Sequence, residues 1–279
     1  MKPFSLETPL GHTLNISVFE GDGKKGVVVI SSATGVLQKY YRQFAAYLQE
    51  LGYTVFTFDY HSIGSSEKEI RRNEINLSQW AVNDQANVLQ YAKKMASKQP
   101  LYLVTHSIGG QLFGLNPNYH LVKKVLMIAP QTGYWRYYKG VHYIKMWMFW
   151  HLLIPGLTPI FGYFPARKMG LFENIPKNVA YEWVRWGKHP LYMLGNLKNE
   201  EHYFNEINLP IKYLTFPGDT YAPVEAAHWM VSQFKSARVT HMHIDPEKEG
   251  LPPIGHFGFF RSKFKHSLWN DSINWLESE

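Results

Sequence analysis

Leu101-Tyr-Leu-Val-Thr-His-Ser107-Ile-Gly-Gly110 is the stretch that decides the fold of this chain. An apolar run of β type ends in a serine and breaks at once into glycines. This pattern is typical of a nucleophile elbow, in which a strand stops, the chain turns sharply at the serine and a helix begins. The strained turn and the close helix favour small residues two positions either side of the serine. Gly109 meets this need, whereas Thr105 stands where the upstream glycine is expected. Taken alone, the stretch also fits a structural turn at a strand end.

Strands and helices are predicted to alternate along most of the chain. Apolar runs of β type predict an N-terminal hairpin and a series of buried strands at 4–7, 13–19, 27–30, 53–58, 101–106, 125–128, 211–216 and 239–244. Apolar residues at helical spacing predict helices at 41–51, 80–95, 224–234 and 264–276. This alternation predicts an α/β fold with a mostly parallel central sheet and helices on both faces, in which sites lie at the carboxyl ends of the strands.

The segment 131–208 breaks the alternation. It is rich in aromatic residues, including five tryptophans, and carries prolines at intervals (Trp135, Trp147, Trp150, Trp183 and Trp186). An insertion of this size after a core strand predicts a cap, and its aromatic content indicates an apolar cavity wall. The same aromatics also fit a simpler role, in which they attach the cap to the core. The predicted domains are therefore a core of residues 1–130 and 209–279 and an inserted cap or lid of residues 131–208.

Composition excludes several classes of function. The chain has 279 residues, a formal net charge of +7 and no cysteine, so disulfides, thiolate metal sites and cysteine nucleophiles are absent. Its basic residues are scattered and form no stripe with interleaved aromatics, so no nucleic-acid partner is predicted. The N-terminus lacks the apolar core of a signal peptide, which favours a cytoplasmic protein. Neither the composition nor the motifs predict an oligomeric state.

One uncharged run, at 146–164, has roughly the length of a membrane-spanning helix. Prolines and glycines inside the run are expected to interrupt a single helix, as is His151 (Pro155, Gly156, Pro159 and Gly162). The run is therefore interpreted as buried or site-lining structure, and no integral membrane span is predicted.

Two further residue types that serine chemistry needs follow later strands. A serine hydroxyl is a weak nucleophile, and it requires a general base within hydrogen-bond reach and a carboxylate that orients this base. Asp219 lies in a tight turn after the strand at 211–216, and His256 lies in a glycine-flanked loop after the last strand. Because the carboxyl ends of parallel strands meet at one edge of a sheet, Ser107, Asp219 and His256 are predicted to form a catalytic triad.

Other titratable residues fit these roles less well. Asp245 also follows a strand, but it precedes a polar loop and comes close before the loop histidine in the element order. Asp59 lies where such folds use a carboxylate to brace a loop. His106 adjoins the serine, but its side chain is expected to point away, which indicates packing. His241 and His243 share a face of the last strand, yet no third ligand is evident, so no metal site is predicted.

Acyl transfer also needs donors for the developing oxyanion. The backbone N–H of Ile108, directly after the serine, is one expected donor. The second is expected from the loop after the strand at 27–30, whose small residues Ser31-Ser-Ala-Thr-Gly35 let a substrate approach the backbone. Thr34 is the preferred candidate in this loop, with Ala33 next.

With these residues in these positions, the chain resembles an α/β-hydrolase of the serine-nucleophile branch. The loop Phe58-Asp-Tyr-His-Ser-Ile-Gly-Ser-Ser66 resembles the D-x-R-G-x-G-x-S segment of that family, with His61 and Ser62 in place of the arginine and the first glycine. These matches span the core and leave only the cap outside the general pattern. Thr105 and the Ser-Ser-Ala-Thr-Gly loop, which replaces the more usual His-Gly, depart from the family and bear on the geometry of the oxyanion hole.

The cap stretch is similar to a group of uncharacterised bacterial predicted α/β-hydrolases. The similarity rests on Gly162-Tyr-Phe-Pro165, Ile175-Pro-Lys-Asn-Val-Ala-Tyr-Glu-Trp183 and Arg185-Trp186. This resemblance implies the fold and the triad, with no known substrate.

The sequence therefore predicts a serine hydrolase of the carboxylesterase or lipase kind, with no cofactor. An aromatic, nearly acid-free cap favours small-molecule esters or thioesters of apolar acyl or aryl groups, whereas a serine excludes the aspartate chemistry of haloalkane dehalogenases and epoxide hydrolases. Three alternatives stay open: an acyltransferase, a non-catalytic ligand-binding protein, and an aminopeptidase. The last would hold an amino group with carboxylates from the cap (Glu173, Glu182, Glu200 and Glu201).

Overall fold

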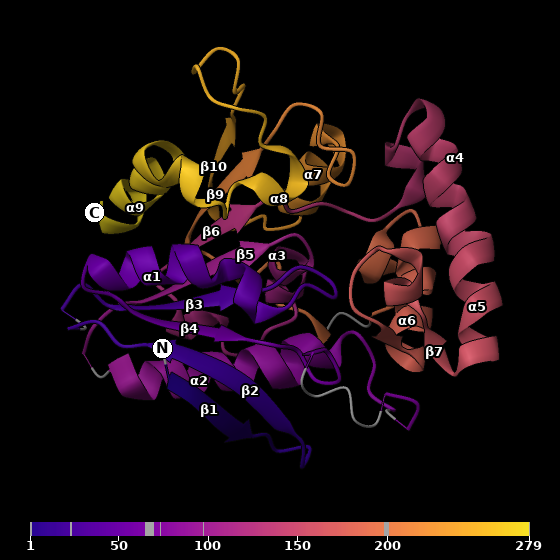
Figure 1. Ribbon diagram of the computed structural model, residues 1–279, viewed down its shortest axis with the longest axis horizontal. Helices are drawn as coiled ribbons and strands as arrows, with labels where there is room; N and C mark the ends of the chain where they lie inside the picture. The colour runs from indigo at the N-terminus through magenta and orange to yellow at the C-terminus, as the bar shows by residue number, and fades with distance from the viewer. Residues whose placement is uncertain are drawn as a thin grey trace.

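The computed structural model describes residues 2–22, 24–64, 70–72, 74–96, 98–197 and 201–278. Within these residues the main sheet has eight strands in the order β1-β2-β4-β3-β5-β6-β9-β10 (Figure 1). Their bounds are β1 (Lys2–Glu7), β2 (Thr13–Phe19), β3 (Val27–Ser31), β4 (Thr54–Phe58), β5 (Leu101–His106), β6 (Lys124–Ile128), β9 (Pro210–Thr215) and β10 (Arg238–His243). β2 pairs antiparallel with β1 and β4, and every pairing from β4 to β10 is parallel.

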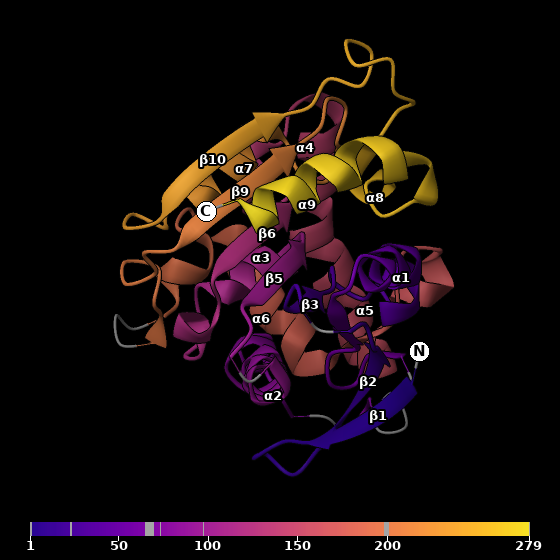
Figure 2. The ribbon, with the colours of Figure 1, turned by 90° about the vertical axis from the view of Figure 1, so that its left-hand side faces the viewer.

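Helices cover both faces of this sheet. They are α1 (Arg42–Glu50), α2 (Ala86–Ala96), α3 (Ile108–Phe113), α7 (Val224–Val231), α8 (Gly255–Gly258) and α9 (Asn270–Glu277). One core cluster joins α1 and α9 to the sheet, and Figure 2 shows α9 lying across the strands of this face. The other cluster joins α2, α3 and α7 to the opposite face. The predicted fold class, a mostly parallel sheet with helices on both faces, is confirmed.

Side-chain alternation explains why the central strands read as continuous apolar runs. In β3, Val27 and Val29 belong to one core cluster, whereas Val28 and Ile30 belong to the other. Successive residues of a strand point to opposite faces, so a strand covered on both faces needs apolar residues at every position. All five residues of β3 are buried.

Two predicted helices begin differently from expectation. A π-helical turn at Trp80–Gln85 precedes α2, and a second at Lys265–Trp269 precedes α9. Widened turns of this kind are common near functional sites. In the first turn, Asn83, Asp84 and Gln85 are all buried in succession, which a regular amphipathic helix would not place on one face.

Residues 131–208 connect β6 to β9 and form a separate group of helices beside the sheet, on the right of Figure 1. The group contains α4 (Gly140–Met148), α5 (Ile154–Phe161), α6 (Lys177–Lys188) and a two-stranded sheet of β7 (Tyr163–Phe164) and β8 (Ile175–Pro176). Short 3₁₀ turns occur here and elsewhere in the chain, at Gln38–Tyr41, Tyr119–Leu121, Trp135–Tyr137, Ala166–Met169, Tyr192–Gly195 and Ser262–Phe264.

The expectation that prolines interrupt the run at 146–164 is wrong. Helix continues from α4 through a π-helical turn at Phe149–Leu153 into α5, and it ends only at Gly162 in a left-handed conformation. Pro155 lies in the first turn of α5, where a missing N–H is tolerated, and the π turn before it absorbs the change in hydrogen bonding. None of the helices in the described ranges is long and apolar enough to cross a membrane.

The turn between β5 and α3 has the strained backbone that the sequence predicts. Ser107 has φ 52° and ψ −116°, outside the ordinary regions for a residue with a side chain. A Cβ at Gly109 would lie 2.7 Å from the carbonyl oxygen of Ser31, and a Cβ at Gly110 would lie 3.0 Å from Thr105 Oγ1. The helix therefore crosses the strands in direct contact. Because Gly110 has no side chain, the Thr105 side chain fits beneath it.

Replacing Gly110 by alanine tests this compensation. Overpacking against Thr105 and the Met127 sulfur, which would lie 3.4 Å away, costs about 1–3 kcal/mol, offset in part by about 1 kcal/mol of helix propensity. We expect Gly110→Ala to lower the free energy of unfolding of the parent protein. In a Thr105→Ala background the same substitution should cost less, by at least about 0.5 kcal/mol. Urea unfolding of the four proteins measures the coupling.

Gly109→Ala is the matched control for this cycle. Its new Cβ meets the Ser31 backbone, which cannot rotate away, so Thr105→Ala should leave its cost unchanged. Equal coupling for both glycines would show that Thr105 and Gly110 do not compensate one another.

Candidate active site

Ser107 lies at the carboxyl end of β5 and begins helix α3. Its N–H donates to the carbonyl oxygen of Ile128 at the end of β6, with 2.9 Å between N and O. Its side chain is held between the strand ends, and the residue is only 6% exposed. The serine is therefore fixed at the sheet edge where the sequence placed it.

Asp219 and His256 meet at the same edge. His256 Nδ1 lies 2.9 Å from Asp219 Oδ2, and both residues are buried. The other carboxylate oxygen, Oδ1, accepts the N–H groups of Tyr221 and Ala222, each at 2.9 Å. Because a carboxylate only accepts, His256 carries its proton on Nδ1 and leaves Nε2 open as an acceptor. The turn after β9 thus orients the imidazole through these three hydrogen bonds.

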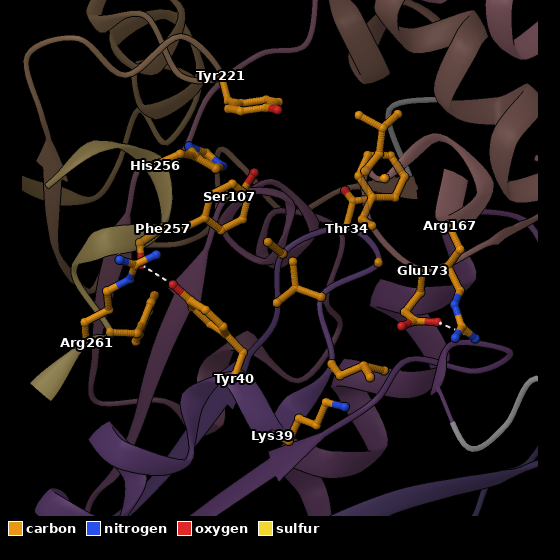
Figure 3. A pocket seen from close by; sticks show the side chains of 18 of the residues that line it. Thr34, Lys39, Tyr40, Ser107, Arg167, Glu173, Tyr221, His256, Phe257 and Arg261 are labelled. Carbon is orange, nitrogen blue, oxygen red and sulfur yellow. Dashed lines mark hydrogen bonds and ion pairs between the residues drawn. The ribbon is translucent and has the colours of Figure 1, made fainter. Parts of the chain in front are cut away.

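Ser107 makes its hydrogen bonds with a residue that the sequence did not single out. Gln131 Nε2 donates to Ser107 Oγ at 3.1 Å, and Gln131 Oε1 lies 3.4 Å from the same hydroxyl. No hydrogen bond joins Ser107 to His256 within the described residues, although both line one cavity (Figure 3). Catalytic hydrogen bonds are often formed only once substrate is in place. Gln131 could have been suspected from its place three residues beyond β6, at the same sheet edge.

The two expected oxyanion donors are free in the part of the chain that the structure describes. Neither the N–H of Ile108 nor that of Thr34 donates to another described residue, and Thr34 lines the cavity with Ser107 (Figure 3). The N–H of Ala33, the next candidate, donates instead to the hydroxyl of Tyr41 at 2.9 Å. This bond favours Thr34 over Ala33.

A buried chain of hydrogen bonds connects the loops around the serine. Tyr41 receives the N–H of Ala33 and lies 2.9 Å from His106 Nδ1, and His106 Nε2 lies 2.9 Å from the carbonyl oxygen of His256. Because that carbonyl can only accept, His106 carries its proton on Nε2 and accepts the Tyr41 hydroxyl proton on Nδ1. His106 therefore connects the loop at 31–35 (the oxyanion loop), the turn at Ser107 and the loop around His256, and it does more than pack.

A second buried network supports the elbow from beneath. Gln85 Nε2 donates to Ser31 Oγ at 2.8 Å and to the carbonyl oxygen of Gly109 at 3.0 Å. Ser31 Oγ also bonds to the Tyr60 hydroxyl at 2.6 Å, and Asn116 Nδ2 donates to Gln85 Oε1 at 2.9 Å. The π-helical turn before α2 places Gln85 at this point, and a sequence pattern gives no signal for it.

The alternative acids are engaged elsewhere. Asp245 forms an ion pair with Lys248 at 3.6 Å. Asp59 accepts the N–H of Gln38 at 2.7 Å and its side-chain amide at 3.1 Å, and burial raises the pKa of Asp59. His241 and His243 both bond to the hydroxyl of Thr215, each at 2.8 Å.

The backbone at Ser62 supports the resemblance of its loop to the family segment. Ser62 has φ 62°, a left-handed conformation, at the position where the family has glycine. His61, which stands for the arginine, stacks on His12 with 3.7 Å between ring centroids. Its N–H donates to Asp84 at 2.8 Å.

The four glutamates of 131–208 that the aminopeptidase alternative would use have different surroundings. Glu173 lines the cavity with Ser107 and pairs with Arg167 at 3.5 Å. Glu182 is buried and accepts the N–H of Ser78 at 2.8 Å, and burial raises its pKa. Glu201 is exposed, and Glu200 lies outside the described residues.

Two cavities meet at Ser107. We call the larger the outer cavity; it has a volume of about 920 Å³ and is bounded by Thr34, Tyr40, His256, Phe257 and Arg261 among others. The inner cavity, about 610 Å³, extends under 131–208 between α4, α5 and α6 and is lined largely by apolar side chains, including Phe149, Trp150, Leu153, Leu157 and Trp183. Ser107, Thr34 and Gln131 line both.

Comparisons with known proteins identify a family for the chain and its fold. The model of the family described as serine aminopeptidase, S33, matches residues 22–169, just over half of the chain. No match is found among curated protein sequences.

Several solved structures are similar over nearly the whole chain. A soluble variant of monoglyceride lipase from Saccharomyces cerevisiae, in complex with a substrate analogue, has 14% identity and a TM-score of 0.73, with 99% of this chain and 94% of that chain covered. An esterase from Exiguobacterium antarcticum has 12% identity and a TM-score of 0.64, covering 99% and 100%. Est1E from Butyrivibrio proteoclasticus with bound ferulic acid has 15% identity and a TM-score of 0.58, covering 95% and 93%. At these identities the similarity shows the fold.

Removing the Tyr41 hydroxyl tests the connecting network. Tyr41→Phe leaves the Ala33 N–H and His106 Nδ1 buried without partners, so we expect a loss of about 1–3 kcal/mol in the free energy of unfolding. Tyr102→Phe is the matched control, because Tyr102 is also buried and its hydroxyl forms no hydrogen bond with the described residues. Urea unfolding should separate the two variants, and equal losses would contradict the network.

The buried imidazole of His106 predicts acid lability. Burial, and to a lesser extent repulsion from the nearby imidazole of His256, holds the pKa of His106 well below its ordinary value of 6.5. Below pH 6.5 the His106 side chain is therefore protonated in the unfolded chain but not in the folded protein. The free energy of unfolding falls as pH falls, by about 1.4 kcal/mol per pH unit for this group. Burial also lowers the pKa of His241, to about 4, so it acts in the same direction.

His106→Gln isolates the contribution of His106 to the pH dependence of stability, because glutamine keeps a donor and an acceptor but does not titrate. Unfolding free energies measured between pH 7.5 and pH 5.5 should fall less steeply for the variant than for the parent protein. Identical slopes would mean that His106 is protonated in the folded state.

Proposed function

We propose that this chain, which belongs to the serine aminopeptidase S33 family of α/β-hydrolases, is a serine hydrolase that cleaves esters or thioesters of apolar acyl or aryl groups. The observation that carries the proposal is the Asp219–His256 pair, joined at 2.9 Å, whose histidine lines the same cavity as Ser107. The pair presents His256 Nε2 as a general base beside a strained, buried serine.

The proposed reaction begins when the Ser107 hydroxyl exchanges Gln131 for His256. Ser107 Oγ attacks the carbonyl carbon of the substrate while its proton moves to His256 Nε2. The resulting imidazolium is stabilised by Asp219, and it then gives the proton to the departing alkoxide or thiolate. A water molecule, deprotonated by His256, attacks the acyl-enzyme, and the proton returns to Ser107 as the acid leaves. An acyltransferase would follow the same steps with another acceptor in place of water.

The oxyanion formed in each half of the reaction needs donors on the side of the carbonyl away from His256. The N–H groups of Ile108 and Thr34 fit this role, since neither has another partner within the described residues. Each such donor is worth about 3–4 kcal/mol of transition-state stabilisation in serine hydrolases. The Tyr41 bond to Ala33 holds the oxyanion loop in the conformation that presents Thr34.

Residues 131–208 act in this proposal as a cap that selects the acyl group. The inner cavity lies under α4, α5 and α6, and its walls are aromatic and aliphatic. An apolar acyl chain is stabilised there by about 0.8 kcal/mol for each buried methylene. The volume of about 610 Å³ is within the range of pockets that take a small molecule.

An aminopeptidase is less well supported by the surroundings of the serine. It would need a free carboxylate to bind the substrate amino group. Among the described residues that line the outer cavity, Glu173 is the single carboxylate, and its charge is matched by Arg167 at 3.5 Å. Ester or thioester hydrolysis requires no such group.

Labelling with a fluorophosphonate probe tests the nucleophile. The parent protein should be labelled, and Ser107→Ala should abolish labelling, because only an activated serine displaces fluoride from the probe. Ser232→Ala, at an exposed serine on another part of the surface, is the matched control and should label like the parent. Labelling that survives Ser107→Ala would overturn the assignment, and a parent protein that is not labelled would favour a non-catalytic role.

Turnover of a short nitrophenyl ester tests the other two residues. We expect His256→Ala and Asp219→Asn each to lower kcat by about 10⁴-fold, since the first removes the base and the second removes the acceptor that fixes its tautomer. Asp245→Asn, at the alternative acid, should leave kcat within about twofold of the parent value. Loss of activity in Asp245→Asn but not in Asp219→Asn would reverse the assignment of the acid.

A further inference from the structure

The outer and inner cavities differ in charge as well as in shape. Besides its apolar walls, the outer cavity has four cationic side chains and one carboxylate (Lys39, Arg42, Arg167, Arg261 and Glu173). The inner cavity has two basic side chains, His142 and Lys145, at α4, and its other described walls carry no charge. Ser107 lies where the two cavities meet, so the two halves of a substrate face different surroundings.

The cations of the outer cavity come from separate parts of the chain. Lys39 belongs to the 3₁₀ turn before α1, Arg42 begins α1, Arg167 follows β7, and Arg261 follows α8. Figure 3 shows Lys39, Arg167 and Arg261 around the cavity that Ser107 faces. A chance run of basic residues in one helix or loop therefore does not explain all of them, because the fold brings three distant segments, which carry Lys39 with Arg42, Arg167 and Arg261, to one opening.

Three of these cations form no salt bridge with a described residue, although Lys39 lies close enough to the Asp59 carboxylate to favour its charged form. Arg167 pairs with Glu173 at 3.5 Å, whereas Lys39, Arg42 and Arg261 form no ion pair with any described residue. All three are exposed at the rim, where each charge is solvated and carries little cost. A cleft lined by one sign of charge concentrates ligands of the opposite sign and raises their association rate by about 10–10³-fold.

We propose, resting on the serine hydrolase function above, that the substrate is an acyl ester or thioester whose leaving group carries phosphate or carboxylate groups. The apolar acyl chain occupies the inner cavity, and the anionic leaving group extends into the outer cavity toward Lys39, Arg42 and Arg261. The opposite orientation would place the anion in a cavity whose walls are mainly aromatic and aliphatic, with basic side chains only at α4, and would place the apolar chain among the cations of the outer cavity. Guanidinium groups also bind phosphate and carboxylate oxygens in pairs, which suits two arginines at the opening.

The chemical step balances without a further reactant. The bond from the acyl carbon to the leaving oxygen or sulfur breaks, and the leaving atom takes the proton that His256 received from Ser107. Water then supplies the hydroxyl of the released acid and restores the serine proton. The cations take no part in bond breaking; they hold the leaving group and lower the KM.

Three octanoyl thioesters with the same acyl group separate charge from chain length. The thiols are N-acetylcysteamine, which is neutral, 3-mercaptopropionate, which has one carboxylate, and coenzyme A, which has phosphates. We expect kcat/KM to be about tenfold or more higher for at least one anionic thioester than for the neutral one, and this preference to weaken as salt is added. Which anionic thioester is preferred distinguishes a carboxylate from a phosphate ligand.

A triple variant identifies the residues responsible. Lys39→Gln with Arg42→Gln and Arg261→Gln should remove most of the preference, mainly through a higher KM for the anionic thioester. The matched control changes three exposed lysines that do not line the cavity, Lys24, Lys98 and Lys235, to glutamine, and so alters the net charge equally. The control variant should keep the preference of the parent.

The failure of this proposal differs from the failure of the proposed function. If the three thioesters are hydrolysed at equal kcat/KM, or if both triple variants lose the preference equally, the anionic leaving group is excluded while the serine hydrolase stands. If none of the thioesters is hydrolysed and the fluorophosphonate probe does not label Ser107, the proposed function itself is wrong.

Discussion

The direct contact between α3 and the sheet beneath Ser107 is the constraint on which the rest of the site depends. A serine with φ 52° stores about 1–3 kcal/mol of backbone strain, which the surrounding structure must offset. Two hydrogen bonds hold the turn from opposite sides, one from Ser107 N–H to Ile128 and one from Gln85 to the Gly109 carbonyl. With the turn fixed, the Ser107 oxygen, the proposed nucleophile, and the Ile108 N–H have defined directions before any substrate binds.

The second level of organisation is the chain of bonds through His106. It joins three loops that follow different strands, and every polar atom in it is satisfied only while the imidazole stays neutral. A buried network of this kind is stabilising when complete and costly when one member is lost. Position of the oxyanion loop and position of the His256 backbone are therefore coupled, although no side chain of the proposed triad takes part in the connection.

Sequence patterns predicted the elements that have a periodic pattern of apolar residues and the turns that need glycine. Runs of β type located every strand of the main sheet but not the short strands β7 and β8, and the glycines after Ser107 predicted the turn, because both signals are local. Gln131, Gln85 and Tyr41 could not be predicted in the same way, since their roles arise from contacts with Ser107, Gly109 and His106 that only the folded chain creates. The helix through Pro155 was missed because a π-helical turn, which has no sequence signature, accommodates the proline.

Gln131 contacts the serine hydroxyl and lines both cavities. Its amide donates to Ser107 Oγ at 3.1 Å, a neutral hydrogen bond worth about 1 kcal/mol net. Exchanging this bond for one to His256 is therefore inexpensive, and the amide that is released remains beside the carbonyl under attack. Because Gln131 lines the inner and the outer cavity, occupation of either one can bias the exchange. Under the proposed function, a substrate with its apolar end in the inner cavity and its anionic end in the outer cavity would favour the exchange most.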